Sequence, residues 1–236
     1  MGFPLVFSEN NKQLVIQVTM LQRTFHVQSR KDHKIMAISL NKGQALNLTK
    51  TADNGLSSVM VGLGWDEKQK STKGFFKTLF ASGSNIDCDA SAFLLKNGKL
   101  ETNKDIVYYG RLSHYSGAVN HQGDNLTGAG DGDDEQIMID LNKLPQSYNK
   151  IMIVVNIFSA ESRRQSFGMI KNAFIRIVDN RTNTEICRYN LSDGYDNDTA
   201  MVFGELTREN NGEWTFTAIG KGSRAGSIDD LADNYK

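Results

Sequence analysis

The sequence lacks a long hydrophobic run, a cysteine framework and a net charge. Its 27 Lys and Arg residues balance 27 Asp and Glu residues, which excludes a protein that coats nucleic acid through general positive charge. The longest apolar run, Ile151 to Val155, is far shorter than the roughly 20 residues of a membrane-spanning helix. The two cysteines, Cys88 and Cys187, have neither a CxxC nor a zinc spacing. We therefore expect a soluble, cytoplasmic protein with no transmembrane segment and no nucleic-acid partner.

The composition is that of a folded chain, with 39% hydrophobic and 23% charged residues, enough for one large domain or two small ones. Residues 1–35 differ from the rest, because basic residues predominate there and the few apolar residues follow no sustained period. This segment also lacks the apolar core and cleavage site of a secretory signal. We predict a weakly structured extension at 1–35 and a single domain at 36–236.

The domain from Met36 onward is predicted to be all-β. Short runs rich in Val, Ile, Phe, Tyr and Thr are separated by clusters of Gly, Asn and Asp, and about nine such strands favour a sandwich or a barrel. Two segments, Ala160 to Phe167 and Ser227 to Tyr235, are predicted to be helical. The predicted strands are Ser58 to Gly64, Ala90 to Leu95, Ile106 to Tyr109, Ile137 to Leu141, Lys150 to Phe158, Ala173 to Val178, Glu185 to Asn190, Ala200 to Thr207 and Glu213 to Ile219.

Two acidic segments carry the chemistry that the sequence suggests. Residues 124–135 contain five carboxylates and three glycines but no Lys or Arg, and residues 85–91 place oxygen-bearing side chains at every second position, on one face of an extended chain. Two carboxylates about 4 Å apart repel each other by on the order of 4 kcal/mol at an effective dielectric constant of about 20. A divalent cation would offset this repulsion.

The pattern favours calcium, because calcium accepts six to eight oxygen ligands in loose geometry whereas magnesium requires an octahedron. An EF-hand is excluded, since Ala90 and Lys96 stand where its glycine and glutamate would be if Asn85 began the loop. A hydrated acidic turn without metal is the alternative that the residues leave open.

Six motifs stand in unbroken order between Met36 and Tyr235. They are Ser39-Leu40-Asn41-Lys42-Gly43-Gln44, Val61-Gly62-Leu63-Gly64-Trp65-Asp66, Asp87-Cys88-Asp89-Ala90-Ser91-Ala92-Phe93-Leu94-Leu95, the run from Gly123-Asp124-Asn125 to Glu135, Arg163-Arg164-Gln165-Ser166-Phe167-Gly168, and Phe203-Gly204-Glu205-Leu206. Together they resemble the TerD family of tellurium-resistance and general stress proteins.

The resemblance implies an all-β, two-sheet β-sandwich with one or two short helices, in a cytoplasmic, non-enzymatic stress-response protein of bacterial tellurite-resistance operons. It also implies two neighbouring Ca²⁺ ions and partners among the other proteins of such operons, including a membrane-bound one. The residues that it assigns to calcium are Asp66, Asp87, Asp89, Asp124, Asn125, Asp131, Asp133, Asp134 and Glu135, with Ser91 as an additional candidate.

Two other functions stay open at the level of sequence. A Ca²⁺-dependent module for membrane surfaces or phospholipids is compatible with the lysine-rich and phenylalanine-bearing stretch Glu67 to Ser84. A metal-dependent hydrolase is compatible with an acidic two-metal site, but neither a general base nor a substrate-pocket signature is evident.

Several other residues are given structural roles. His114 and His121 are predicted to lie on the surface, because no zinc-ligand spacing involves them. The pair Arg163 and Arg164 is predicted to form an exposed charged face. The tryptophans, Trp65 and Trp214, are expected in the core or at its rim.

The N-terminal segment gives the first testable prediction. Met36-Ala37-Ile38-Ser39-Leu40 resembles a natural protein start, and Arg30-Lys31-Asp32 could be encoded by a purine-rich run that resembles a ribosome-binding site. Our hypothesis is that translation starts at Met36 and that residues 1–35 correspond to untranslated leader sequence upstream of that start. The intact mass of the natively expressed product is then expected to correspond to a start at Met36, and a product that begins at Met1 contradicts this.

Overall fold

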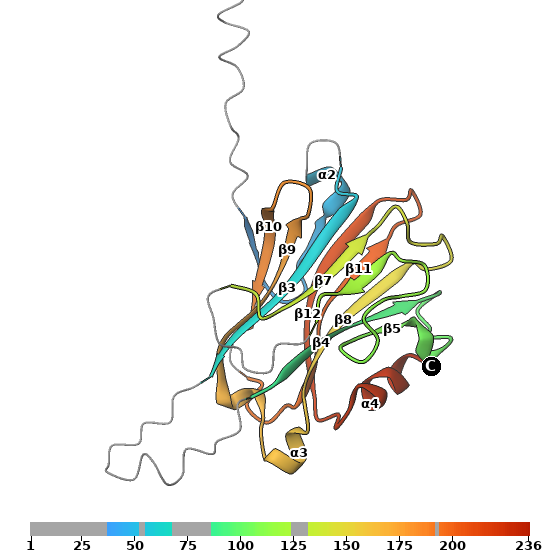
Figure 1. The fold of residues 1–236 in the computed structure, drawn as a ribbon. Helices are drawn as coiled ribbons and strands as arrows, with labels where there is room; N and C mark the ends of the chain where they lie inside the picture. The colour runs from blue at the N-terminus through green and yellow to red at the C-terminus, as the bar shows by residue number, and fades with distance from the viewer. Residues whose placement is uncertain (1–36, 52–54, 68–85, 124–131, 192–193) are drawn as a thin grey trace, which may run out of the picture. The chain divides into compact units, whose positions relative to one another are not determined.

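Two six-stranded sheets pack face to face around one hydrophobic core (Figure 1). The structure is a computed structural model that describes residues 37–51, 55–67, 86–123, 132–191 and 194–236. These residues belong to one structural unit, Met36–Lys236. The predicted extension at 1–35 lies outside the described residues, so its structure stays a prediction.

The first sheet has the strand order β1-β10-β9-β3-β7-β6. Its strands are antiparallel except for the parallel pair β1 and β10. Their bounds are Ile38–Leu40 for β1, Ser58–Glu67 for β3, Val119–His121 for β6, Glu135–Asp140 for β7, Ile170–Asp179 for β9 and Thr184–Asn190 for β10.

The second sheet is antiparallel throughout and has the order β2-β12-β11-β8-β4-β5. Its strands are β2 (Ala45–Asn47), β4 (Cys88–Leu95), β5 (Ile106–Val107), β8 (Lys150–Ile157), β11 (Ala200–Arg208) and β12 (Trp214–Ser223).

The all-β sandwich predicted from the sequence is confirmed, and each of the nine predicted strands is present. Three strands of three residues each, β1, β2 and β6, were not predicted, because so short a segment shows no period of its own. The predicted helix Ala160 to Phe167 is reduced to α3 (Ala160–Arg163), followed by a 3₁₀ turn at Phe167–Met169. The short helix α2 (Leu48–Thr51) was not predicted.

The second sheet is covered on both faces, which explains why β4 is buried along its whole length. Its Ala90, Ala92 and Leu94 point into the core between the sheets, whereas Phe93 and Leu95 pack in a second hydrophobic cluster on the outer face. Leu231 of α4 (Ile228–Ala232) completes this outer cluster. A strand buried on both faces reads as a near-continuous apolar run rather than an alternating one.

The C-terminal helix α4 begins with a conventional cap. The hydroxyl of Ser227 accepts a hydrogen bond from the backbone N–H of Asp230 at 3.1 Å. Both Asp229 and Asp230 lie in the first turn, where negative charge interacts favourably with the helix dipole. These local interactions fix the segment that lies against the outer face of the second sheet.

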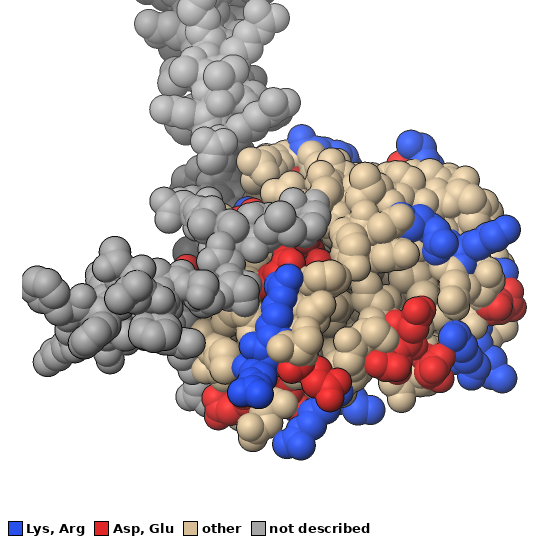
Figure 2. Space-filling model, turned by 60° about the horizontal axis from the view of Figure 1, so that its bottom comes forward, with Lys and Arg blue, Asp and Glu red and all other residues tan. Residues whose placement is uncertain are grey.

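Other expectations from composition can be compared with the structure directly. Both tryptophans are buried in the core, as expected, and both cysteines are buried and free. None of the helices in the described part of the chain combines the length and the apolar character needed to cross a bilayer. On the face shown in Figure 2, the acidic and basic side chains that are coloured are interspersed rather than gathered into one basic surface.

The prediction that His114 and His121 lie on the surface is wrong, since they are only 2% and 4% exposed. His114 Nε2 lies 3.3 Å from Asp105 Oδ1, and its Nδ1 lies 2.7 Å from Ser116 Oγ. The hydroxyl of Tyr148 donates to the same Asp105 oxygen at 2.7 Å. Hydrogen bonding of this kind compensates the burial of a polar ring, and it could not be read from sequence spacing.

This network predicts a pH dependence of stability. Burial lowers the pKa of His114, and hydrogen bonding to Asp105 offsets the effect only in part. The unfolded chain, with a histidine pKa of about 6.5, therefore binds this proton more readily than the folded protein. Stability from the neutral ring is present above about pH 6.5 and is lost as the pH falls through the lower folded pKa.

The measurement is the melting temperature as a function of pH for the wild type and for His114→Gln. We expect the wild type to lose stability more steeply on acidification, because the glutamine cannot titrate. Equal slopes for the two proteins would show that His114 does not contribute.

Candidate metal centre

The two acidic segments identified in the sequence meet where β3 ends and β7 begins. These strands are antiparallel neighbours, with Leu63 opposite Glu135. The backbone N–H of Asp134 donates to Leu63 O at 2.7 Å, and the N–H of Trp65 donates to Asp134 Oδ2 at 2.9 Å. The last residues of the acidic loop are therefore fixed against the end of β3, next to Asp66.

We call the region where the two acidic segments meet, around Asp66, Asp87, Asp89, Asp134 and Glu135, the acidic corner. Glu135 connects the two sheets there. Glu135 is 2% exposed and accepts a hydrogen bond on Oε2 from the backbone N–H of Ala90 in β4. His121 Nε2 lies 3.5 Å from the same carboxylate oxygen and 3.2 Å from Ala90 O. The acidic loop and the acidic strand, 45 residues apart at this contact, are thus held side by side by a buried carboxylate.

The buried thiol of Cys88 lies near the carboxylates of the acidic corner, and their charges affect its pKa. Burial raises its pKa well above the usual value, and the carboxylates of Asp89, Glu135, Asp87 and Asp134 raise it further. These four groups come from both sheets and act on one atom. Negative charge is therefore concentrated where the two acidic segments meet.

The pKa of Asp134 is raised for related reasons. Burial is the main cause, the N–H of Trp65 opposes it, and the neighbouring charges of Asp66 and Asp133 add to it. Asp66 itself accepts a hydrogen bond from Asn172 Nδ2 at 2.6 Å. Asp66 and Asp134 thus form the more accessible part of the acidic corner, since both are half-buried.

The carboxylates do not all point the same way. Asp89 and Ser91 alternate along β4 with Ala90 and therefore lie on the outer face of the second sheet, whereas Glu135 points between the sheets. Among the described residues, no three His, Cys, Asp or Glu side chains converge as a group that could hold a metal ion. Convergence would need donors from residues 124–131, and the predicted ligands Asp124, Asn125 and Asp131 lie outside the described residues.

Asp133 has a different partner from the others. Arg176 in β9 holds its buried carboxylate bidentately, with Nε to Oδ1 at 2.6 Å and Nη2 to Oδ2 at 2.9 Å. Gly62 makes room for this pair, because a Cβ there would lie 2.4 Å from the carboxylate carbon of Asp133. Both oxygens are used in this ion pair, so the geometry favours a structural role, and the predicted role as metal ligand stays untested.

Three residues that bear side-chain donors lie around the acidic corner: Arg163, which is exposed as predicted, and Asn156 and Arg176, which sequence reasoning missed. Arg163 Nη1 lies 4.0 Å from Asp87 Oδ2, and Asn156 Nδ2 lies 3.4 Å from Asp89 Oδ2. Asn156 was detectable, since it interrupts the apolar run of β8. Arg176 gave no signal, because alternation along a strand shows which face a side chain occupies but not its partner across the sheet.

The fold and the order of the acidic residues agree with a known family. The sequence model for the TerD domain matches residues 36–235. This chain belongs to the TerD family. It is 48% identical over 200 residues to stress response protein SCP2 of Bacillus subtilis (strain 168), covering 85% of this chain and 100% of that protein. It is 45% identical over 192 residues to the tellurium resistance protein TerD of Serratia marcescens, covering 81% and 93%.

Solved structures show the same TerD fold. The crystal structure of a homologue of telluride resistance protein (TerD), SCO6318 from Streptomyces coelicolor A3(2), superposes with a TM-score of 0.58. It covers 77% of this chain and 99% of that chain, at 20% identity. The resemblance to the TerD family inferred from the six motifs is therefore confirmed.

The pairing of Arg176 with Asp133 gives a prediction for stability. Arg176→Met removes one partner of a pair whose carboxylate is fully buried, and we expect a loss of about 3 kcal/mol in the free energy of unfolding. The comparison is Arg188→Met, which removes a partly exposed pair with Glu185, a residue that Arg176 also contacts, and which should cost about 1 kcal/mol or less. Chemical denaturation measures both.

A double variant distinguishes the cost of the unpaired Asp133 charge from the loss of the contact with Arg176. Adding Asp133→Asn to Arg176→Met should recover part of the lost stability, because an uncharged amide is easier to bury than an unpaired carboxylate. Equal losses in Arg176→Met and Arg188→Met would contradict a special role for this pair.

Proposed function

We propose that this TerD-family chain is a non-enzymatic, calcium-binding stress-response protein. Two Ca²⁺ ions, held by the acidic loop and the adjacent acidic strand, would organise a surface for partners. Curated relatives named as tellurium resistance and general stress proteins support the stress-related part of this proposal. The concentration of carboxylates where the two acidic segments meet supports the calcium-binding part.

The main argument is the number of carboxylates that lie close together at the acidic corner. Arg176 pairs with Asp133, and Arg163 approaches Asp87 at 4.0 Å. The charges of Asp66 and Asp133 help to raise the pKa of Asp134, and those of Asp89, Glu135, Asp87 and Asp134 help to raise the pKa of the buried Cys88 thiol. Carboxylates at this density repel one another strongly where water is excluded, so a divalent cation would stabilise the corner.

The chemistry of the donors fits calcium better than a softer metal. The candidate ligands bear carboxylate, amide and hydroxyl oxygens, and calcium prefers six to eight oxygen donors. The hydroxyl of Ser91 is buried on the same face of β4 as Asp89 and has no hydrogen-bond partner among the described residues. An unpaired buried oxygen beside a carboxylate is a suitable additional donor.

The proposed ligands are therefore Asp66, Asp87, Asp89, Asp134 and Glu135 of the described chain, together with Asp124, Asn125 and Asp131. Calcium would supply the positive charge that joins the two segments, and Glu135 already aligns them through Ala90. We propose that the resulting surface binds other tellurite-resistance proteins in the cytoplasm, including a membrane-bound one. The lipid-binding alternative depends on Glu67 to Ser84, which lie almost wholly outside the described residues.

Calcium should raise the thermal stability of this protein in a titratable way. By linkage, a ligand at 100 times its dissociation constant adds about 2.7 kcal/mol to the free energy of unfolding. Magnesium should act more weakly, because it resists an irregular oxygen cage. Calorimetric titration of chelator-treated protein, with melting curves at each calcium concentration, measures affinity, stoichiometry and stabilisation together.

Variants locate the site. Asp134→Asn keeps an oxygen that can accept from Trp65 but removes the charge, and Asp131→Asn does the same in the predicted loop. Both should reduce the calcium-dependent shift in melting temperature. The control, Asp140→Asn, lies at the opposite end of β7 and should leave the shift unchanged. If both acidic variants retain the full shift, the calcium centre is misplaced.

A further inference from the structure

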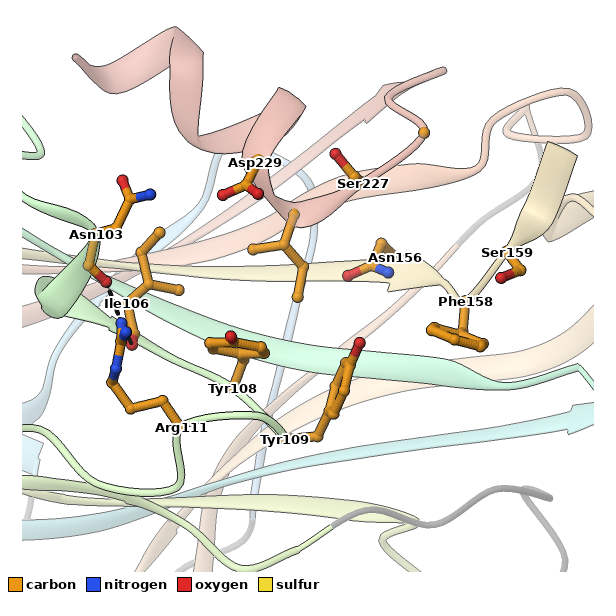
Figure 3. Close-up of a pocket in the computed structure, with 12 residues that line it drawn as sticks. Asn103, Ile106, Tyr108, Tyr109, Arg111, Asn156, Phe158, Ser159, Ser227 and Asp229 are labelled. Atoms are coloured by element: carbon orange, nitrogen blue, oxygen red, sulfur yellow. Dashed lines mark hydrogen bonds between the residues drawn. The ribbon is translucent and has the colours of Figure 1, made fainter.

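A cavity of about 400 Å³ lies on the outer side of the second sheet (Figure 3). Its lining comes from β5 and the loop after it, from the end of β8 and from the first residues of α4. The volume is within the range of pockets that enclose small organic molecules. Its polar groups indicate which class of molecule it would accept.

Three aromatic rings form one wall of this cavity. The rings of Tyr108 and Tyr109 meet edge to face at 5.2 Å between centroids, and Tyr109 meets Phe158 in the same way at 6.2 Å. Tyr109 and Phe158 are each more than one-third exposed. Both rings are therefore partly accessible from solvent, and exposed side chains change rotamer within nanoseconds.

The rings are suited to organic cations. Cations bind over aromatic faces because the ring quadrupole places negative potential there. One such contact already exists at this wall, where the guanidinium carbon of Arg163 lies 5.1 Å from the centroid of Phe158. Tyr108 and Tyr109 offer further aromatic surface to a second cation.

Asn156 contributes a polar side chain to the cavity wall. Asn156 is 5% exposed, and its Oδ1 is buried without a hydrogen-bond partner among the described residues. Its Nδ2 lies 3.4 Å from Asp89 Oδ2. A hydrogen bond to a carboxylate polarises the amide and increases the negative charge on its oxygen. In Figure 3, Asn156 lies between the tyrosines and the segment that bears Ser227 and Asp229.

The charges of the lining are arranged along the cavity. The guanidinium of Arg111 donates to the backbone carbonyls of Asn103 and Ile106, at one end of the view in Figure 3, and Phe158 lies at the other. Asp229 adds a carboxylate to the lining. The end near Asn156 and Phe158 is distant from the guanidinium of Arg111 (Figure 3), and the guanidinium of Arg163 lies near Phe158 at that end.

We propose that this cavity binds a small organic ammonium ion with an aromatic or aliphatic body. The ammonium group donates to Asn156 Oδ1 after a modest rotation of Tyr109 or Phe158, and the apolar body packs on Tyr108 and Ile106. This proposal does not require calcium to be bound, although Asn156 also contacts Asp89, one of the proposed calcium ligands.

The test uses phenethylamine as the probe and 2-phenylethanol as its uncharged counterpart, titrated into chelator-treated protein by calorimetry. We expect the amine to bind and the alcohol to bind at least about tenfold more weakly, because a charged donor forms the stronger hydrogen bond. Equal binding of the two compounds, or no binding of either, overturns the proposal.

Three variants test the location. Asn156→Ala removes the acceptor and should weaken the amine about tenfold. Tyr109→Ala changes only a partly exposed ring and should weaken it about threefold, so it remains informative if Asn156→Ala destabilises the fold. The matched control for charge is Asp233→Asn, which pairs with Lys236 outside the cavity and should bind as the wild type does.

Binding at the acidic corner gives a different pattern. If Asp134→Asn abolishes amine binding while Tyr109→Ala and Asn156→Ala do not change it, the amine binds among the carboxylates and the cavity proposal is wrong. If calcium has no effect on stability but the amine binds as expected, the cavity proposal holds and the proposed function fails.

Discussion

The contact between Glu135 and the backbone of β4 is the interaction on which the acidic corner depends. A carboxylate placed between two sheets is costly unless it is hydrogen-bonded, and the N–H of Ala90 and the ring of His121 provide that compensation. Because Glu135 is the last residue of the acidic loop and the first of β7, its position determines where the loop ends. The acidic strand beside it is positioned by the same contact.

The carboxylates of Asp133 and Asp89 lie on the outer faces of different sheets. Asp133 is directed to the outer face of the first sheet and to Arg176, so it is neutralised locally. Asp89 is directed to the outer face of the second sheet and to Asn156. These two carboxylates thus have different partners, a guanidinium for Asp133 and an amide for Asp89.

Asn156 links two regions with different chemistry. Its amide nitrogen lies 3.4 Å from Asp89 Oδ2, in the acidic corner, and the residue also lines the aromatic cavity. Through this hydrogen bond, the carboxylate of Asp89 polarises the amide group of Asn156. Asn156 is a polar residue within the apolar strand β8, and its contacts with Asp89 and with the cavity explain its position there.

The sequence by itself determined the all-β class, the nine strands β3 to β5 and β7 to β12, the two acidic segments and the TerD family, because these depend on local patterns of residue type. It did not determine the short strands β1, β2 and β6, which form only through pairing with longer neighbours. It also misplaced His114 and His121, and it could not separate Asp133 from the other carboxylates. Only the tertiary structure decided these points, since the burial and the partner of a side chain depend on residues brought together from distant parts of the chain.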